Sequence, residues 1–323
     1  MLTGAARAVC FDFRRIRVLH REEYRGRRRL YGKQVVMRLI SRRWFVQSGA
    51  AVLGARGTWA LPAGVPIGLQ FYSVSEELKK DVPGTLRRLR AIGYGRVETA
   101  GLAGLTAKAF RAQLDETGLV CLSTHLPVGN QDLNSLFDDA HTVGARYVVS
   151  SGTFSSTSGS QTLDDYRAMA DRLNELGRRA RQAGLQYAYH NHNFEFRSLD
   201  GDRIGYDVLL KQTDAELVAF ELDCGWMVAA GHSPVEYFRQ YPGRYRMLHV
   251  KDFVATKEPS TSLAKNERPQ GTELGRGHID YKPILDAAAK AGIHDYYVEQ
   301  EPPFVEMPAL EAVRVDYQYL RAL

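Results

Sequence analysis

Four successive β-rich segments in the second half of the chain end in side chains that can bind a metal ion or transfer a proton. They are His190 and His192 in 185–192, Asp223 in 217–223, His249 in 245–252, and Glu299 in 296–301. Desolvating such groups in an apolar strand is costly, and one divalent cation offsets that cost for several of them. Mixed nitrogen and oxygen donors suit Mn, Zn, Co, Mg or Fe(II). The pattern predicts a divalent-metal site; the alternative for each histidine is a hydrogen-bonded core residue.

These segments belong to an alternating β/α pattern that begins at residue 66. Eight short β-rich runs are separated by amphipathic stretches that end in glycine, such as RRLRAIGY and DAAAKAGI. The runs are 67–74, 96–100, 119–125, 146–152, 185–192, 217–223, 245–252 and 296–301. Eight such units predict a single-domain (β/α)8 TIM barrel. The alternative is an open doubly wound sheet, but the first βα turn, QFYSVSEELKKD, lacks the glycine-rich phosphate motif.

Residues 66 to about 318 resemble the sugar phosphate isomerase/epimerase family, the xylose isomerase-like TIM barrels. In that family each of the last four strands supplies one metal ligand, commonly Glu, Asp, His and Glu, and Asp223, His249 and Glu299 match three of them. The resemblance implies a small hydroxy-carbonyl sugar as substrate. It also implies proton abstraction next to the carbonyl through an enediolate that the metal stabilises. Glu299 is the first choice for the base.

The fourth ligand departs from the family pattern. Many members read Glu-Asn-His at the end of the fifth strand, where this chain reads His190, Asn191 and His192. Either His190 replaces the family glutamate, or the loop folds back so that Glu195 supplies the ligand. We favour Glu195, because a second carboxylate suits the expected proton transfer, and whichever residue is used becomes the partner of Glu299.

Further residues match family positions near the substrate. Lys251, in HVKD, is predicted to polarise a substrate oxygen and joins Glu299 and Glu195 as a catalytic residue, whereas Asp252 is expected to anchor the next loop. A surface ion pair is the alternative for Lys251 and Asp252. The predicted substrate-binding residues are Glu98, His125, His192 and Trp226. Trp226 could stack on a sugar ring or simply pack in the barrel rim, and Glu98 could orient a neighbouring group instead of touching substrate.

The basic character of the chain is confined to its first part. Residues 1–47 hold 13 of the 43 lysines and arginines but 3 of the 37 aspartates and glutamates, which leaves 30 basic and 34 acidic residues in the body. A mildly acidic body lacks the basic face that a phosphate backbone requires. Nucleic acid is therefore not expected as a partner, and the three-metal DNA endonucleases of the wider superfamily are disfavoured.

The basic segment leads into a pattern that resembles a twin-arginine export signal. Arg42 and Arg43 in SRRWFVQ precede the apolar stretch SGAAVLGARGTWALPAG, which ends at small residues and is too short and polar to span a bilayer. We expect residues 1–63 to be a basic extension and a removable signal peptide, and 64–323 to be the barrel. The mature protein would then be periplasmic and free of the membrane. The alternative is a cytoplasmic protein with a basic N-terminal helix.

A periplasmic address favours a non-phosphorylated sugar or keto-sugar as substrate, and the sequence has no phosphate-binding loop. The predicted function is a metal-dependent sugar isomerase or epimerase. On a 3-keto-glycoside the same proton abstraction could expel the aglycone, which would make the enzyme a lyase or hydrolase. A sugar-binding barrel without catalysis is the third alternative, and a homo-oligomer is left open. Cys121 and Cys224 are expected to be buried thiols, not a disulfide framework.

Overall fold

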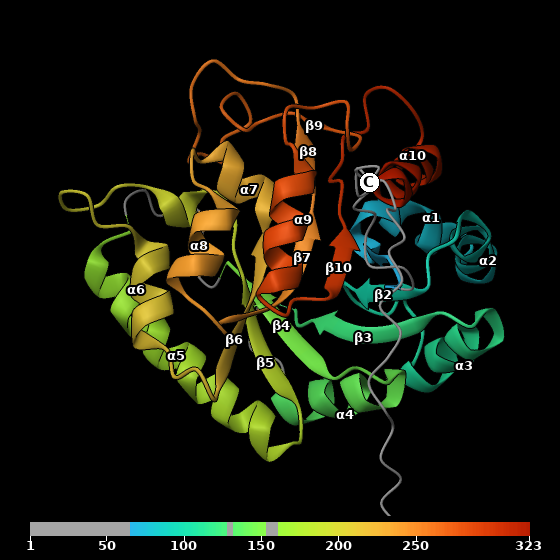
Figure 1. Ribbon diagram of the computed structural model, residues 1–323. Coiled ribbons are helices and arrows are strands. Elements are labelled where there is room, and N and C mark those ends of the chain that lie inside the picture. The colour runs from blue at the N-terminus through green and yellow to red at the C-terminus, as the bar shows by residue number, and fades with distance from the viewer. Residues whose placement is uncertain (1–64, 128–131, 153–160) are drawn as a thin grey trace, which may run out of the picture. The chain divides into compact units, whose positions relative to one another are not determined.

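The computed structural model describes residues 65–127, 132–152 and 161–323 (Figure 1). The predicted signal peptide, with Arg42 and Arg43, lies outside the described residues. Within them, no helix combines the length and the apolar composition needed to cross a membrane. Cys121 and Cys224 are both buried and free, as predicted.

Eight parallel strands close into a barrel, which confirms the fold class predicted from the sequence (Figure 1). They follow one another around the barrel in the order β1, β10, β7, β6, β5, β4, β3, β2. The strands are β1 (Gly68–Gln70), β2 (Arg96–Thr99), β3 (Val120–His125), β4 (Tyr147–Ser151), β5 (Gln186–His190), β6 (Val218–Asp223), β7 (Tyr245–Val250) and β10 (Asp295–Val298). Parallel strands end on the same side, so the residues at their carboxyl ends meet at one mouth.

Helices connect successive strands and surround the barrel (Figure 1). They are α1 (Ser75–Lys80), α2 (Val82–Ile92), α3 (Ala107–Thr117), α4 (Leu133–Val143), α5 (Leu163–Gln182), α6 (Gly205–Gln212), α7 (Cys224–Ala229), α8 (Pro234–Gln240), α9 (Tyr281–Lys290) and α10 (Ala309–Ala322). The longest of them, α5, begins at a capping box in which Thr162 and Asp165 satisfy each other's backbone N–H groups. Its Gly177 is required for close packing, because a Cβ there would lie 2.5 Å from the Leu217 carbonyl oxygen.

The first predicted run, 67–74, is a strand only as far as Gln70. Residues Phe71–Val74 form a 3-10 helix, η1, because Gln70 Oε1 accepts a hydrogen bond of 3.2 Å from Tyr72 N and so caps a tight turn. The last residues of the predicted run 245–252 also differ, since Asp252–Phe253 form a separate strand, β8. It pairs antiparallel with β9 (Gly271–Thr272) at the base of the long loop that follows β7.

Asp252 anchors this long loop, as the sequence predicts. Its two carboxylate oxygens accept hydrogen bonds of 2.9 to 3.2 Å from five backbone N–H groups, at Phe253, Gly275, Gly277, His278 and Ile279. One buried side chain therefore fixes both ends of the loop next to the barrel mouth.

The barrel interior contains its own small apolar cluster, separate from the larger core between strands and helices. It consists of Tyr147, Val149, Ala188, Ala219, Met247 and Tyr297, and we call it the interior plug. Neighbouring residues on the same strands, such as Phe220 and Leu248, belong to the outer core. Side chains alternate between the two faces of a strand, so the next interior residues toward the carboxyl ends lie directly beyond the plug. These are the positions at which the predicted site residues occur.

Candidate metal centre

Strand register places the donor residues side by side at the mouth of the barrel. Pairing of β5 with β6 aligns His190 with Glu221, and pairing of β6 with β7 aligns Asp223 with His249. Donor atoms of His190, Asp223, His249 and Glu299 all lie within 4.8 Å of one another, and all four side chains are buried. We call these four residues the rim set. The structure thus brings together the three family-matched residues and the first of the two fifth-strand alternatives.

Glu195, the alternative that sequence reasoning favoured, does not join the rim set. It lies in the 3-10 helix η2 (Phe194–Phe196), where its carboxylate accepts hydrogen bonds from the Tyr189 hydroxyl at 2.6 Å and from His192 N at 2.9 Å. Tyr189 alternates with His190 on β5 and belongs to the outer core, so Glu195 is held on the outer side of the strand. Burial raises the pKa of Glu195 to about 7. Through these hydrogen bonds Glu195 fixes the conformation of the turn that contains His190 and His192.

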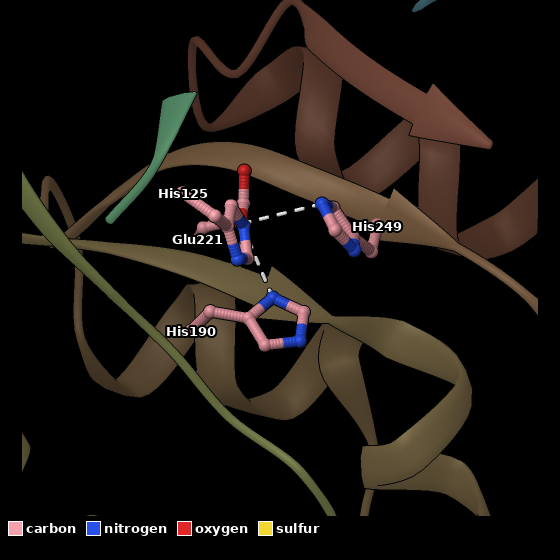
Figure 2. Close-up of side chains that lie close together, drawn as sticks. All are labelled: His125, His190, Glu221 and His249. Atoms are coloured by element: carbon pink, nitrogen blue, oxygen red, sulfur yellow. Dashed lines mark hydrogen bonds and ion pairs between the residues drawn. The ribbon is translucent and has the colours of Figure 1, made fainter. Parts of the chain in front are cut away.

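Glu221 is a central residue that the sequence analysis did not select. Its Oε2 lies 3.0 Å from His125 Nε2, 3.1 Å from His190 Nδ1 and 3.2 Å from His249 Nε2, as Figure 2 shows in part. His125, His190, Glu221 and His249 form a second group of potential metal donors, which we call the inner set. Glu221 precedes Asp223 by two residues, so strand alternation could have identified it.

Two imidazoles belong to both sets and turn different nitrogens toward each. His190 Nδ1 faces Glu221, whereas its Nε2 lies 3.9 Å from Asp223 Oδ2. His249 Nε2 likewise faces Glu221, whereas its Nδ1 lies 3.2 Å from Glu299 Oε2. A carboxylate that accepts from one ring nitrogen fixes the tautomer and leaves the other nitrogen free to bind a metal. Glu221 is placed to do this for His190, and at His249 Nε2 it is joined by Glu98, whose Oε2 lies 2.6 Å away.

Glu98 supports the same arrangement from β2. Its carboxylate accepts hydrogen bonds from Gln70 Nε2 at 2.7 Å and from Ser123 Oγ, and it lies 2.6 Å from His249 Nε2. Although burial alone would raise it, His125 and His249 hold the pKa of Glu98 well below its usual range. Glu98 therefore orients neighbouring groups, the alternative that the sequence had left open.

Lys251 is the cation at the centre of the rim. Its Nζ lies 2.6 Å from Glu299 Oε2, 3.2 Å from Asp223 Oδ2 and 2.5 Å from Glu301 Oε1. Burial would lower the pKa of Lys251, but the three carboxylates outweigh burial and raise it above its usual range. Burial would raise the pKa of Glu299, but Lys251 and His249 hold it well below its usual range. Both groups are therefore charged at neutral pH.

A cavity of about 190 Å3, the mouth cavity, opens above these residues. It is lined by Gln70, Tyr72, Ala100, His125, Ser151, His190, His192, Glu299 and Glu301. Of the predicted substrate-binding residues, His125 and His192 therefore lie on its wall, whereas Glu98 and Trp226 are fully buried beneath or beside it. Trp226 donates its indole N–H to Glu301 at 3.2 Å and has Lys251 Nζ 5.0 Å from its ring, so it packs behind the charged groups.

Sequence comparison connects residues 86–323 with a family described as the xylose isomerase-like TIM barrel. Inosose dehydratase of Lacticaseibacillus casei is 31% identical over 150 residues, which are 44% of this chain and 49% of that protein. The corresponding protein of Clostridium beijerinckii is 30% identical over 165 residues, 46% of this chain and 54% of that protein. The chain thus spans about half the length of these curated relatives.

Structure comparison agrees with the sequence comparison. A sugar phosphate isomerase/epimerase from Parabacteroides distasonis is 26% identical, with a TM-score of 0.67 over 86% of this chain and 98% of that one. The 3-keto-D-glucoside 4-epimerase of E. coli has a TM-score of 0.60 at 18% identity over 80% of this chain and 100% of that one. The IOLI protein with a bound zinc atom has a TM-score of 0.61 at 18% identity, over 78% and 95%. At 18% identity the last two share the fold alone.

Proposed function

The chain belongs to the xylose isomerase-like TIM barrel family, and from this we propose a metal-dependent enzyme that abstracts a proton next to the carbonyl of a sugar or keto-sugar. The observation that carries the proposal is the rim set, in which His190, Asp223, His249 and Glu299 converge within 4.8 Å at the carboxyl end of the barrel. Family barrels place their chemistry at this end of the strands.

The rim set fits a divalent cation. Asp223 Oδ2 is buried and accepts no hydrogen bond from the described residues, although Lys251 Nζ is 3.2 Å away. Burial raises the pKa of Asp223 to about 6, a cost that an added positive charge would relieve. Two imidazole nitrogens and two carboxylates are a donor set that Zn, Mn or Fe(II) accepts. A cation bound there would supply Lewis acidity to the carbonyl and hydroxyl oxygens of the substrate.

Glu299 is the residue that we assign as the base. It lines the mouth cavity and is ionised, as a base must be. Its Oε2 makes the contacts to His249 and Lys251, so Oε1 is the oxygen we assign to the substrate proton. Lys251 steadies this carboxylate and can donate a hydrogen bond to a substrate oxygen once the substrate displaces one of its partners.

The second proton-transfer group must come from the same cavity. His125 and His192 line it, and His192 Nδ1 is buried without a hydrogen-bond partner among the described residues. Glu195, which the sequence suggested for this role, faces Tyr189 on the outer side of β5. We therefore assign the second group to an imidazole of the mouth cavity, which can both give and take a proton.

The fate of the substrate after proton abstraction separates two candidate reactions. Isomerisation or epimerisation returns the proton to another carbon or to the other face of the same carbon. Elimination instead expels a neighbouring substituent, and the similarity to inosose dehydratases, whose name describes a loss of water, favours this second candidate. Both start with the same step and use the same residues.

A non-phosphorylated substrate is part of the proposal. No arginine or lysine is among the described residues that line the mouth cavity, whereas recognition of a phosphate group normally uses one. The predicted export of the mature chain to the periplasm supports the same substrate class, because phosphorylated sugars are largely cytoplasmic.

The test is the metal content of the protein that begins near residue 64, measured by elemental analysis after purification. We expect about one metal per chain in the wild type, and its loss in Asp223→Ala and His249→Ala. Asp207→Ala, in α6 and outside both donor sets, is the matched control and should keep the metal. Keto-sugars should then exchange their α proton with deuterated solvent. A wild type that stays metal-free after divalent ions are added would overturn the mechanism and favour a sugar-binding barrel.

A further inference from the structure

A second cavity, of about 450 Å3, opens beside the mouth cavity. We call it the side cavity, and its walls include Phe253, Leu263, Lys265, Arg268, Pro302 and Val305. Phe253 belongs to β8, and the others come from the loop between β8 and β9, which extends beyond α7 and α9 in Figure 1, and from the segment after β10. Glu301 lines both cavities, so they share a wall.

The shared wall connects the side cavity directly to the rim set. Glu301 Oε1 accepts from Lys251 Nζ, and Glu301 Oε2 forms an ion pair with Arg268 of the loop. Lys251, which also lines the side cavity, contacts Glu299 and Asp223 in turn. A continuous series of charged contacts therefore runs from the loop to the proposed base. A group bound in the side cavity would lie next to the reacting part of a substrate in the mouth cavity.

The walls of the side cavity combine apolar surface with an unpaired cation. Leu263 is 37% exposed and Val305 is 59% exposed, both high for large apolar residues. Within the described part of the chain, the only acid that lines the cavity is Glu301, which is already paired with Lys251 and Arg268. Lys265 is exposed and has no ion-pair partner among the residues that the structure describes. This combination suits a mostly apolar group that carries a negative charge.

We propose that the side cavity binds the aglycone of a glycoside while the sugar ring occupies the mouth cavity. The aglycone class that fits is an aryl group with a carboxylate directed toward Lys265. This inference rests on the proposed α-proton abstraction and selects elimination as its outcome. It extends the substrate from a simple sugar to a 3-keto-glycoside.

The elimination is balanced without an oxidant or a reductant. Glu299 removes the proton from C2, next to the C3 carbonyl, and the C2–H electron pair becomes the C1–C2 double bond. The bond between C1 and the aglycone oxygen breaks, and that oxygen leaves with the bonding pair. Lys251 lines the side cavity and is placed to stabilise the charge on this oxygen by a hydrogen bond, and the released phenolate takes its proton from solvent. The products are an unsaturated 3-keto sugar and the free aglycone.

The experiment compares 3-ketoglucose with the 3-keto form of 4-carboxyphenyl glucoside. Val305→Trp should fill the side cavity and raise KM for the aryl glycoside about tenfold more than KM for 3-ketoglucose. Lys265→Gln should weaken the binding of the carboxyphenyl glycoside about fivefold relative to that of its phenyl analogue. Val120→Trp is the matched control, because Val120 is 50% exposed at the start of β3, and neither substrate should be affected. Equal effects of Val305→Trp on both substrates would overturn the proposal.

A binding measurement separates this proposal from the proposed reaction. Titration calorimetry with the unoxidised 4-carboxyphenyl glucoside requires no turnover. One outcome is that the wild type binds this glucoside, that Val305→Trp weakens the binding, and that no keto-sugar exchanges its α proton. This outcome would support the side cavity as a glycoside site and refute the proposed reaction. The opposite outcome is that 3-ketoglucose exchanges its α proton but the aglycone does not strengthen binding of the glucoside. That outcome would support the proposed reaction and refute the assignment of the side cavity.

Discussion

The two ends of the barrel interior differ in chemistry although the same strands build both. Met247 and Tyr297 belong to the apolar plug. His249 and Glu299, each two residues later in the chain, belong to the rim set, and Glu299 directly follows β10. All four side chains are buried on the same face. Burial of the plug stabilises the fold, whereas burial of the imidazoles and carboxylates costs free energy unless they are paired. The plug thus contributes to stability, whereas the mouth gathers ionisable side chains where burial is costly, an arrangement that is common at functional sites.

The largest expected effect tests the plug. Tyr297→Ala removes a fully buried aromatic ring and should lower the free energy of unfolding by about 3 to 5 kcal/mol, because a cavity remains inside the barrel. Urea unfolding followed by circular dichroism measures this change. Val235→Ala, at an exposed position on α8, should change it by about 0.5 kcal/mol or less. A loss below 1 kcal/mol for Tyr297→Ala would show that the interior contributes little to stability.

The second prediction concerns the mouth, where a substitution should impair metal binding much more than it lowers stability. Glu221→Gln should weaken metal binding about 10- to 100-fold, because the amide no longer fixes His190 and His249 in one tautomer. Without metal, the free energy of unfolding should change by about 1 kcal/mol or less, since the amide keeps the shape of the side chain and its oxygen can still accept from one of the three imidazoles. Competition with a chelator measures the affinity.

Glu273→Gln is the control for that variant, because Glu273 is equally buried but contacts Thr272, Arg276 and Gln300 rather than an imidazole. Wild-type affinity in Glu221→Gln would mean that Glu98 alone orients His249. A large loss of stability would instead show that Glu221 stabilises the fold as the plug residues do. The two ends of the barrel interior would then not differ in this respect.

Much of the fold and part of the site follow from local sequence patterns. The eight strands were predictable because each run and each glycine-terminated helix is encoded within a few residues. Asp223, His249 and Glu299 were identifiable because parallel strands must end at one mouth. Asp252 was recognisable as a loop anchor at the same end, and its five backbone hydrogen bonds bear this out.

The remainder depends on contacts between distant segments. The separate positions of His190 and Glu195 depend on the Tyr189 hydroxyl, which holds Glu195 on the outer side of β5 through η2, and no local pattern specifies that turn. Glu221 was available from alternation with Asp223, but its three imidazole partners depend on barrel closure. The side cavity depends on the long loop between β8 and β9, whose path the sequence does not encode as regular structure.

The smallest expected effect comes from a buried carboxyl group outside the mouth. Asp316, on α10, accepts a hydrogen bond from Leu274 N at 2.7 Å, but its Oδ2 is buried without a hydrogen-bond partner among the described residues. Burial, and then the charge of Glu273, raise the pKa of Asp316 to about 8. The folded state therefore binds this proton more tightly than the unfolded state, whose carboxyl titrates near pH 4.

Because its folded pKa is the higher one, Asp316 contributes full stability at low pH and loses it as the pH rises from about 4 through 8. Between pH 7 and pH 9 the free energy of unfolding of the wild type should fall by about 1.4 kcal/mol more than that of Asp316→Asn. Urea titrations at pH 5, 7 and 9 give this difference, and Asp286→Asn, at an exposed ion pair, should follow the wild type. Parallel curves for the wild type and Asp316→Asn would show that an unpaired buried carboxyl carries no cost here. In that case, burying a carboxyl group that has no ion-pair partner would cost no more free energy than burying the paired carboxylates around Lys251. The cost of burial would then no longer be a reason to regard the charged mouth as a functional site.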